Sequence, residues 1–378
     1  MKILSYCFFL FTVSFLVQGQ EQHDINTKVL DSLMLEKQFE LAQSNLYNQL
    51  SYIKTNDLND SLYKYVYYVG KIELLKSNAK TASKKADQFL DYITSKTTNK
   101  RVHYQSLLEL ADVYDEIGNN QKSLELTRLA LKAVKKVNDA TPEEVGKVEY
   151  NIGATLISLG NLDEGKTYFQ KALEQFENYN LTSKAQLSDG YNAVGATMWM
   201  SSKLDSAKYF YSKAVKTIEA AEGDPVMNLY LGTVIKSNIS LLEYTQGNLD
   251  EAINIQNDVI LNYEKTIKNH TDENIVSKAK RFQLRAISNM AAFYNEQGNL
   301  EKAHQLMLYS YEKKKKLRES NDADLASTLI QLGQSKISLQ DYGDAINYLQ
   351  QGIEHFQSHA LKNPYWQAAG LHGLAEVY

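Results

Sequence analysis

Three near-copies of one six-residue stretch recur along the chain, and this repetition constrains the fold more than any other feature. The copies are GNLDEG (residues 160–165), GNLDEA (247–252) and GNLEKA (298–303). Each copy lies between two segments whose apolar residues recur at helical spacing. Glycine readily adopts the left-handed conformation that ends a helix, and acidic residues favour the first turn of the next helix. The motif therefore predicts a tight turn between two helices.

The small residue that closes the motif recurs at nearly regular intervals. Two weaker copies, SKLDSA (202–207) and QDYGDA (340–345), keep this small residue but lack the first glycine. With its counterparts upstream, the small residue stands at positions 42, 82, 123, 165, 207, 252, 303 and 345. Such a period predicts a stack of helix pairs, none of which can bury its apolar face alone. The widest interval, between 252 and 303, predicts a longer helix or a protruding loop around Asn262 to Arg281.

The helices that flank the turns carry a recognisable pattern. The first helix has a large apolar residue followed by a small one and, three positions on, another large one, while the second helix has small, aromatic and small residues in turn. Examples are Leu110, Ala111 and Tyr114 in a first helix, and Gly165, Phe169 and Ala172 in a second helix. This pattern resembles the tetratricopeptide repeat, in a long-period bacterial form of about 40–42 residues. The resemblance implies an all-α fold, an α-solenoid superhelix, with divergent helical repeats over residues 20–100 and the repeat array over 101–378.

Composition and charge limit the partners. The 378 residues are 43% hydrophobic with a formal charge of −4, which describes an ordinary globular chain with no basic excess. A nucleic-acid partner is not expected, because binding phosphates needs such an excess. Each of the three prolines follows a residue that can cap a helix, namely Thr141, Asp224 and Asn363, so all three are expected at helix starts.

The first nineteen residues have the features of a signal peptide. Lys2 precedes an apolar stretch from Ile3 to Val17, and the small residues that follow predict cleavage after Gly19. The stretch is shorter than the about 20 residues that a membrane span needs. The only cysteine, Cys7, lies within it, so the mature chain would have no thiol chemistry. These features predict an exported, periplasmic protein.

The C-terminal residues begin another repeat. Leu374, Ala375 and Tyr378 reproduce the pattern of a first helix, with no second helix after them. Half of a helix pair cannot bury its apolar face. We therefore expect the last repeat to be incomplete and the sequence to be a fragment of a longer protein. One alternative is that the missing C-terminal segment attaches this longer protein to a membrane.

No catalytic or metal-binding motif stands out. His355 and His359 share a helical face, but no carboxylate base stands between them, so no metal site is predicted. The sequence has no phosphate-binding glycine loop and no nucleophile elbow. We expect no enzyme activity in this segment and no cofactor. The lysine run from Lys313 to Lys316 is expected to be a solvated helix end, and the tyrosines between Tyr63 and Tyr68 are expected to fill the core.

One polar position recurs in the first helices, directly before the large-small pair. The residues that occupy it are Asn151, Asn238, Asn289 and Gln331. Asparagine is a poor residue for the interior of a helix, so its recurrence calls for a reason. In related superhelices such as that of O-GlcNAc transferase, an asparagine ladder at the matching place lines the concave surface, where an amide can both donate to and accept from a peptide backbone. The ladder is incomplete here, because Glu109 and Ala193 occupy the same position in other repeats. The alternative is that these amides tie neighbouring helices together or face water.

These observations predict an interaction scaffold that binds a partner protein or an extended peptide in its concave groove. Two alternatives concern the whole molecule. In one, the repeats are the periplasmic sensory region of a membrane-bound histidine kinase or helix-turn-helix regulator. In the other, they recruit partners to a CHAT-type peptidase that lies beyond residue 378.

Overall fold

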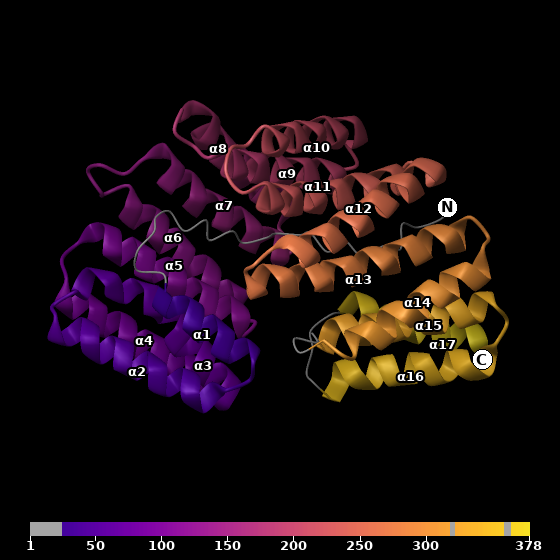
Figure 1. The fold of residues 1–378 in the computed structure, drawn as a ribbon, viewed down its shortest axis with the longest axis horizontal. Coiled ribbons are helices and arrows are strands. Elements are labelled where there is room, and N and C mark those ends of the chain that lie inside the picture. Colours follow the sequence, from indigo (N-terminus) through magenta and orange to yellow (C-terminus); the bar gives the residue numbers. More distant parts are fainter. Residues whose placement is uncertain (1–24, 318–321, 359–363) are drawn as a thin grey trace. The chain divides into compact units, whose positions relative to one another are not determined.

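The computed structural model describes residues 25–317, 322–358 and 364–378, and these residues are all-α (Figure 1). They form seventeen α-helices and one 3-10 helix, with no strand among them. The predicted all-α fold is thus confirmed. The predicted signal peptide (residues 1–19), Asn363 and His359 lie outside the described residues. None of the described helices has both the length and the apolar character needed to cross a bilayer.

Consecutive helices pack as pairs, which is the architecture of an α-solenoid. The described helices form eight such pairs, and α17 (Pro364–Val377) follows them as a first helix without a second. The pairs are α1 (Ile25–Leu35) with α2 (Phe39–Thr55), α3 (Val66–Lys76) with α4 (Ala79–Lys96), α5 (Lys100–Glu116) with α6 (Asn120–Val134), α7 (Pro142–Ser158) with α8 (Leu162–Asn178), α9 (Lys184–Met200) with α10 (Leu204–Glu219), α11 (Pro225–Thr245) with α12 (Leu249–Asn269), α13 (Glu273–Glu296) with α14 (Leu300–Lys314), and α15 (Asp322–Ser338) with α16 (Tyr342–Ser358). The 3-10 helix η1 (Asn59–Tyr65) leads directly into α3.

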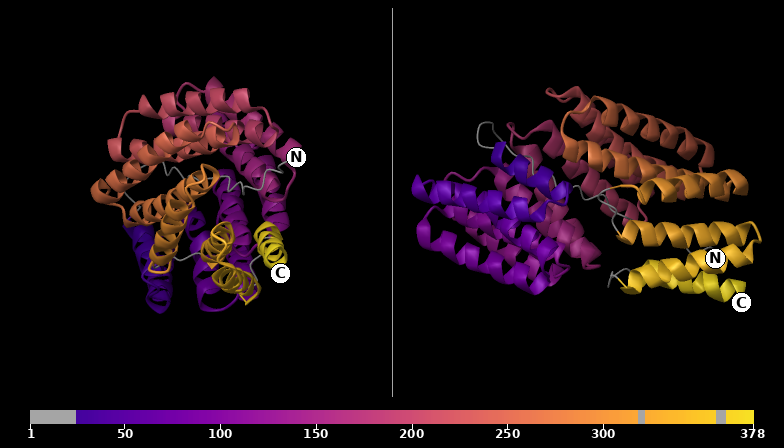
Figure 2. Two further views of the ribbon diagram at one scale, coloured as in Figure 1. Left: turned by 90° about the vertical axis from the view of Figure 1, so that its right-hand side faces the viewer. Right: turned by 60° about the horizontal axis from the view of Figure 1, so that its bottom comes forward.

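The chain divides into two compact units. The first, here called the N-terminal unit, ends at Ala221 after α10, and the second, the C-terminal unit, comprises Glu222–Tyr378 and begins with α11. Figure 2 shows the helix pairs of each unit from two further directions. A continuous apolar core runs through the N-terminal unit from Leu30 to Val148, so each helix pair there buries its face against the next.

The small residues of the repeat pattern lie where the two helices of a pair cross. Ala207, Ala252 and Ala345 are fully buried. A Cβ atom added to Gly165 would lie 2.7 Å from the Ile157 side chain and 3.1 Å from the carbonyl oxygen of Gly153. Because that space is already occupied, only a residue of minimal size lets the two backbones approach so closely.

The predicted turns all have one geometry. Gly160, Gly247 and Gly298 have φ angles of 81°, 83° and 86°. After each glycine, the backbone N–H of the next residue bonds to a carbonyl five residues back, for example Asn161 to Leu156 at 2.8 Å. This is the bond of the Schellman motif, which satisfies carbonyls at the end of a helix.

The two weaker copies of the motif keep this geometry without glycine. Ser202 and Gln340 have φ angles of 57° and 60°. The N–H groups of Lys203 and Asp341, which follow them, again bond five residues back, at 2.8 and 2.9 Å. The packing of the helix pair therefore imposes a left-handed residue at this place, even where a side chain makes that conformation costly.

Two of the three predicted capping residues, Thr141 and Asp224, lie in the described part of the chain, and both cap a helix. Thr141 and Glu144 form the reciprocal capping box at the start of α7, and the Asp224 side chain accepts from the N–H of Val226 at the start of α11.

The wide interval in the repeat is explained by longer helices. α12 and α13 have 21 and 24 residues, against 17 for α7 and α8, and only a short connection joins them.

The packing between pairs shows which side of the stack is the inner one. At three places a first helix packs on the first helix of the following repeat: α3 on α5 in the N-terminal unit, and α11 on α13 and α15 on α17 in the C-terminal unit. Among the described residues, no two successive second helices pack as closely. In a curved stack the elements on the concave side are closer together, so in each unit the first helices lie on the inner side.

A glycine at position 202 should stabilise the protein. We expect Ser202→Gly to raise the free energy of unfolding by about 0.5–1 kcal/mol, because it removes the clash of a Cβ in the left-handed conformation. The matched reverse change, Gly160→Ser, should lower it by a similar amount. Urea denaturation of both variants measures this. Destabilisation by Ser202→Gly would show that the Ser202 side chain makes a compensating interaction.

Candidate peptide-binding face

The four predicted binding residues lie on first helices, at equivalent places. Asn151 is on α7 in the N-terminal unit, whereas Asn238, Asn289 and Gln331 are on α11, α13 and α15, three successive first helices of the C-terminal unit. The structure therefore brings the last three into one unit, at corresponding positions of neighbouring repeats.

The availability of these four amides differs. Asn151, Asn289 and Gln331 are partly exposed, and no side-chain hydrogen bond ties any of them to another described residue. Asn238 is only 5% exposed and does interact within the protein. Burial leaves Asn238 little surface to offer a partner, so three of the four positions have amides that are available for binding.

In the N-terminal unit, helix α5 has carboxyl groups on the corresponding face. Glu109 occupies the position of Asn151, and Asp112 and Glu116 follow at helical spacing, so the three share one face. Glu109 and Asp112 have no hydrogen bond or ion pair with any described residue. Burial, and then the charge of Asp112, hold the pKa of Glu109 well above its usual range. Burial, and then the charges of Asp115 and Glu116, raise the pKa of Asp112 to about 7.

The neighbouring helices α1 and α3 add further polar groups to this face. Lys71 Nζ lies 2.7 Å from Glu116 Oε2, and the Tyr67 hydroxyl donates to Glu116 Oε1 at 2.9 Å. The Tyr68 hydroxyl donates to Asp31 Oδ1 at 3.0 Å. These contacts bear out the expectation that the tyrosines fill the core with their hydroxyls partnered, since Tyr68 is only 9% exposed.

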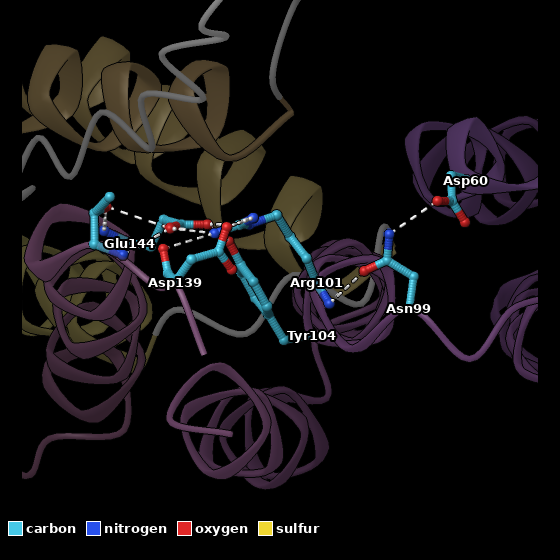
Figure 3. Close-up of polar contacts among 7 residues, drawn as sticks. Asp60, Asn99, Arg101, Tyr104, Asp139 and Glu144 are labelled. Carbon is cyan, nitrogen blue, oxygen red and sulfur yellow. Dashed lines mark hydrogen bonds and ion pairs between the residues drawn. The ribbon is translucent and has the colours of Figure 1, made fainter. Parts of the chain in front are cut away.

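Polar contacts also join the beginnings of successive first helices (Figure 3). Arg101 on α5 forms two hydrogen bonds to Glu144 on α7, from Nε at 2.8 Å and from Nη2 at 3.1 Å, and the Tyr104 hydroxyl donates to Glu144 at 2.6 Å. Burial raises the pKa of Glu144, but the hydrogen bonds from Arg101 and Tyr104 outweigh it and lower the pKa to about 2. Asn99, which caps α5, bonds to Asp60 at 2.9 Å on its other side. This network fixes the first helices relative to one another within the N-terminal unit.

The C-terminal unit has a buried charge network between α13, α14 and α15. Arg285 Nη2 lies 3.0 and 3.1 Å from the two oxygens of Asp324, and Lys314 Nζ donates to Thr328 Oγ1 at 3.0 Å. Burial lowers the pKa of Lys314 to about 8, although the Asp324 carboxylate opposes this. Lys314 is only 5% exposed, so the expectation of a solvated lysine run is wrong at this residue. Its neighbours Lys313, Lys315 and Lys316 are exposed as expected.

Sequence reasoning identified the amide position but missed the carboxyl and charge networks. The only available signal for the acidic face was that Glu109 interrupts the amide series. That Asp112 shares its face follows from helical spacing. That no described cation pairs with these two carboxyl groups depends on the packing of neighbouring helices, which the sequence does not show.

Comparison with known families supports the repeat assignment. Residues 144–220 and 282–358 match the tetratricopeptide repeat model. These two stretches, one in each unit, are thus similar to tetratricopeptide repeats. No curated protein shows a significant match to the chain.

Several solved structures share the fold. A Rap protein complexed with Competence and Sporulation Factor superposes with a TM-score of 0.55 at 13% identity, covering 93% of this chain and 96% of the other. NprR in complex with its cognate peptide NprX gives 0.53 at 14% identity, covering 86% and 83%. A tetratricopeptide repeat protein from Parabacteroides merdae gives 0.53 at 14% identity, covering 83% and 99%. At these identities the likeness shows the fold alone.

Removal of the Glu144 charge should destabilise the N-terminal unit in a pH-dependent way. The folded pKa is depressed, so the contribution of Glu144 is present above its unfolded pKa of about 4.3 and is lost as the pH falls toward 2. We expect Glu144→Gln to lower the free energy of unfolding by about 1–2 kcal/mol at pH 7, and the difference from wild type to shrink from pH 5 to pH 3. Asp139→Asn, which removes a 79% exposed partner of Arg101, is the control and should cost less than about 0.5 kcal/mol. A pH-independent loss in Glu144→Gln would contradict this assignment.

Neutralising Asp112 should have the opposite effect on stability. Its folded pKa is raised, so the folded state is favoured at low pH and loses stability as the pH rises from about 4 through 7. At pH 8 we expect Asp112→Asn to increase the free energy of unfolding by about 1–3 kcal/mol. Glu174→Gln on α8, an exposed carboxylate, is the control and should change it by less than about 0.5 kcal/mol. Destabilisation by Asp112→Asn at pH 8 would show that the carboxylate has a stabilising partner.

Proposed function

We propose that this chain is a binding scaffold that holds an extended peptide, or an extended segment of a protein, along the inner face of the first helices within a compact unit. The observation that carries the proposal is the recurrence of partly exposed amides that have no side-chain partner among the described residues. They stand at one position of the first helices: Asn151 in the N-terminal unit, and Asn289 and Gln331 in neighbouring repeats of the C-terminal unit. Each such amide can donate one hydrogen bond and accept another, as a peptide backbone unit requires. An amide without a partner in the protein exchanges its hydrogen bonds to water for bonds to a ligand and breaks no hydrogen bond within the protein.

The fold likeness is consistent with this role. The Rap protein and NprR were both solved in complex with named binding partners, Competence and Sporulation Factor and the peptide NprX. Binding of an extended chain through its backbone suits a scaffold that accepts different side chains. The signal-peptide features of residues 1–19 lead us to propose further that the partner is met outside the cytoplasm.

The test uses randomised decapeptide libraries and the full chain immobilised on a surface. Wild-type protein should retain a subset of the peptides. Because these amides lie in two units, a retained peptide loses the one or two hydrogen bonds of the unit that holds it. The triple variant Asn151→Ala, Asn289→Ala, Gln331→Ala should therefore bind the retained peptides roughly 5- to 30-fold more weakly, since each lost hydrogen bond contributes about 1 kcal/mol.

The matched control replaces exposed glutamines on the second helices of the same three repeats: Gln170→Ala on α8, Gln305→Ala on α14 and Gln350→Ala on α16. This variant should retain the peptides as wild type does. Equal affinity of the two triple variants, with both folded by circular dichroism, would contradict the proposal that the first-helix amides hold the partner.

A further inference from the structure

The acidic face of α5 lies in the same series of first-helix positions as the proposed peptide-binding amides. Glu109 stands at the position that Asn151 occupies in the next repeat, and Asp112 lies one turn further along the same face. The protein encloses both carboxyl groups on most sides, yet each residue keeps part of its surface open to solvent.

No cation among the described residues forms an ion pair with either of these two carboxyl groups. Lys71 on α3 is engaged by Glu116 at 2.7 Å, and Lys147 on α7 is engaged by Glu143 at 2.7 Å. The charged and polar groups that interact with Glu109 and Asp112 include Tyr68, whose hydroxyl donates to Asp31, and the carboxylates Asp115 and Glu116. Carboxyl groups therefore exceed cations on this face.

A buried carboxylate without a partner is unfavourable, and a sequence selected for stability alone would replace it or pair it. The same arrangement is favourable when a ligand supplies the cation, because the energetic cost of removing the carboxylates from water has already been met in the free protein. Tyr67, which is partly exposed and whose ring meets that of the buried Tyr68 edge-on at 5.6 Å, borders this face with aromatic surface that suits the stem of a long basic side chain.

We propose that Glu109 and Asp112 bind the arginine or lysine side chain of the extended peptide that Asn151, in the next repeat of the same unit, holds by its backbone. The occupant is thus a basic peptide, and α5 determines its specificity. This inference rests on the proposed function, since it names the kind of peptide that the same inner face selects.

The experiment compares two decapeptide libraries on the immobilised full chain. Both are random except for a fixed central residue, which is arginine in one library and its neutral isostere citrulline in the other. Wild-type protein should retain the arginine library at least about tenfold better, a difference of about 1.4 kcal/mol. The double variant Glu109→Gln, Asp112→Asn should lose this preference and still retain the citrulline library as wild type does.

The control is Glu125→Gln, Glu174→Gln, which neutralises two exposed carboxylates on the second helices α6 and α8 and should keep the preference for arginine. Loss of the preference through misfolding is distinguishable, because the Glu109 and Asp112 changes remove unfavourable buried charge and should raise the thermal midpoint at pH 8.

Equal retention of the two libraries by wild-type protein would overturn the proposed selectivity. If that retention still depended on Asn151, Asn289 and Gln331, the peptide-binding function would stand without it. Retention of neither library by wild-type protein would contradict both proposals.

Discussion

The close crossing of the two helices in each repeat is the constraint on which the rest of the structure depends. At this crossing the backbones approach to a distance that only glycine, alanine or serine allows, as Gly153 and Gly165 show. The crossing fixes the angle of the pair, and hence which faces remain apolar and must be covered by the next pair. The turn inherits its geometry from the same crossing. Ser202 and Gln340 adopt a left-handed backbone because the helices on either side are already placed by their packing.

This dependence explains how much could be predicted from the sequence. The repeat period, the turns and the buried small residues are local signals that recur, so they are visible in the sequence alone. For the wide interval, the sequence predicts either a longer helix or a protruding loop, and the structure has the longer helices α12 and α13. The sequence alone does not decide between the two, because the inserted residues have no counterpart in the other repeats. The network of Arg101, Tyr104 and Glu144 could not be predicted, since it joins residues about 40 positions apart whose contact depends on the stacking of pairs. The same holds for Lys314, which belongs to a run of lysines by sequence but lies in the core next to Thr328.

The helix starts and the inner face of the N-terminal unit show different uses of charge. At the helix starts, Glu144 is fully satisfied by an arginine, a tyrosine and the backbone, and its low pKa marks a carboxylate that stabilises the fold. On the inner face, Glu109 and Asp112 have raised pKa values and no paired cation in the described part of the chain, so their ionised forms oppose folding. Sites that reduce stability in this way are expected where function requires them, because they complete their interactions only with a ligand. The two kinds of carboxylate thus separate the architecture from the surface that we propose for binding.

The central claim is that a peptide lies along the first helices, and hydrogen exchange measures this most directly. A basic peptide selected from the arginine library is added to the full chain, and amide exchange is followed by mass spectrometry. The account predicts slower exchange in segments of the first helices α5 and α7, with no change in α6 and α8. Slower exchange confined to the second helices would contradict it, because the peptide would then occupy the outer side of the repeats.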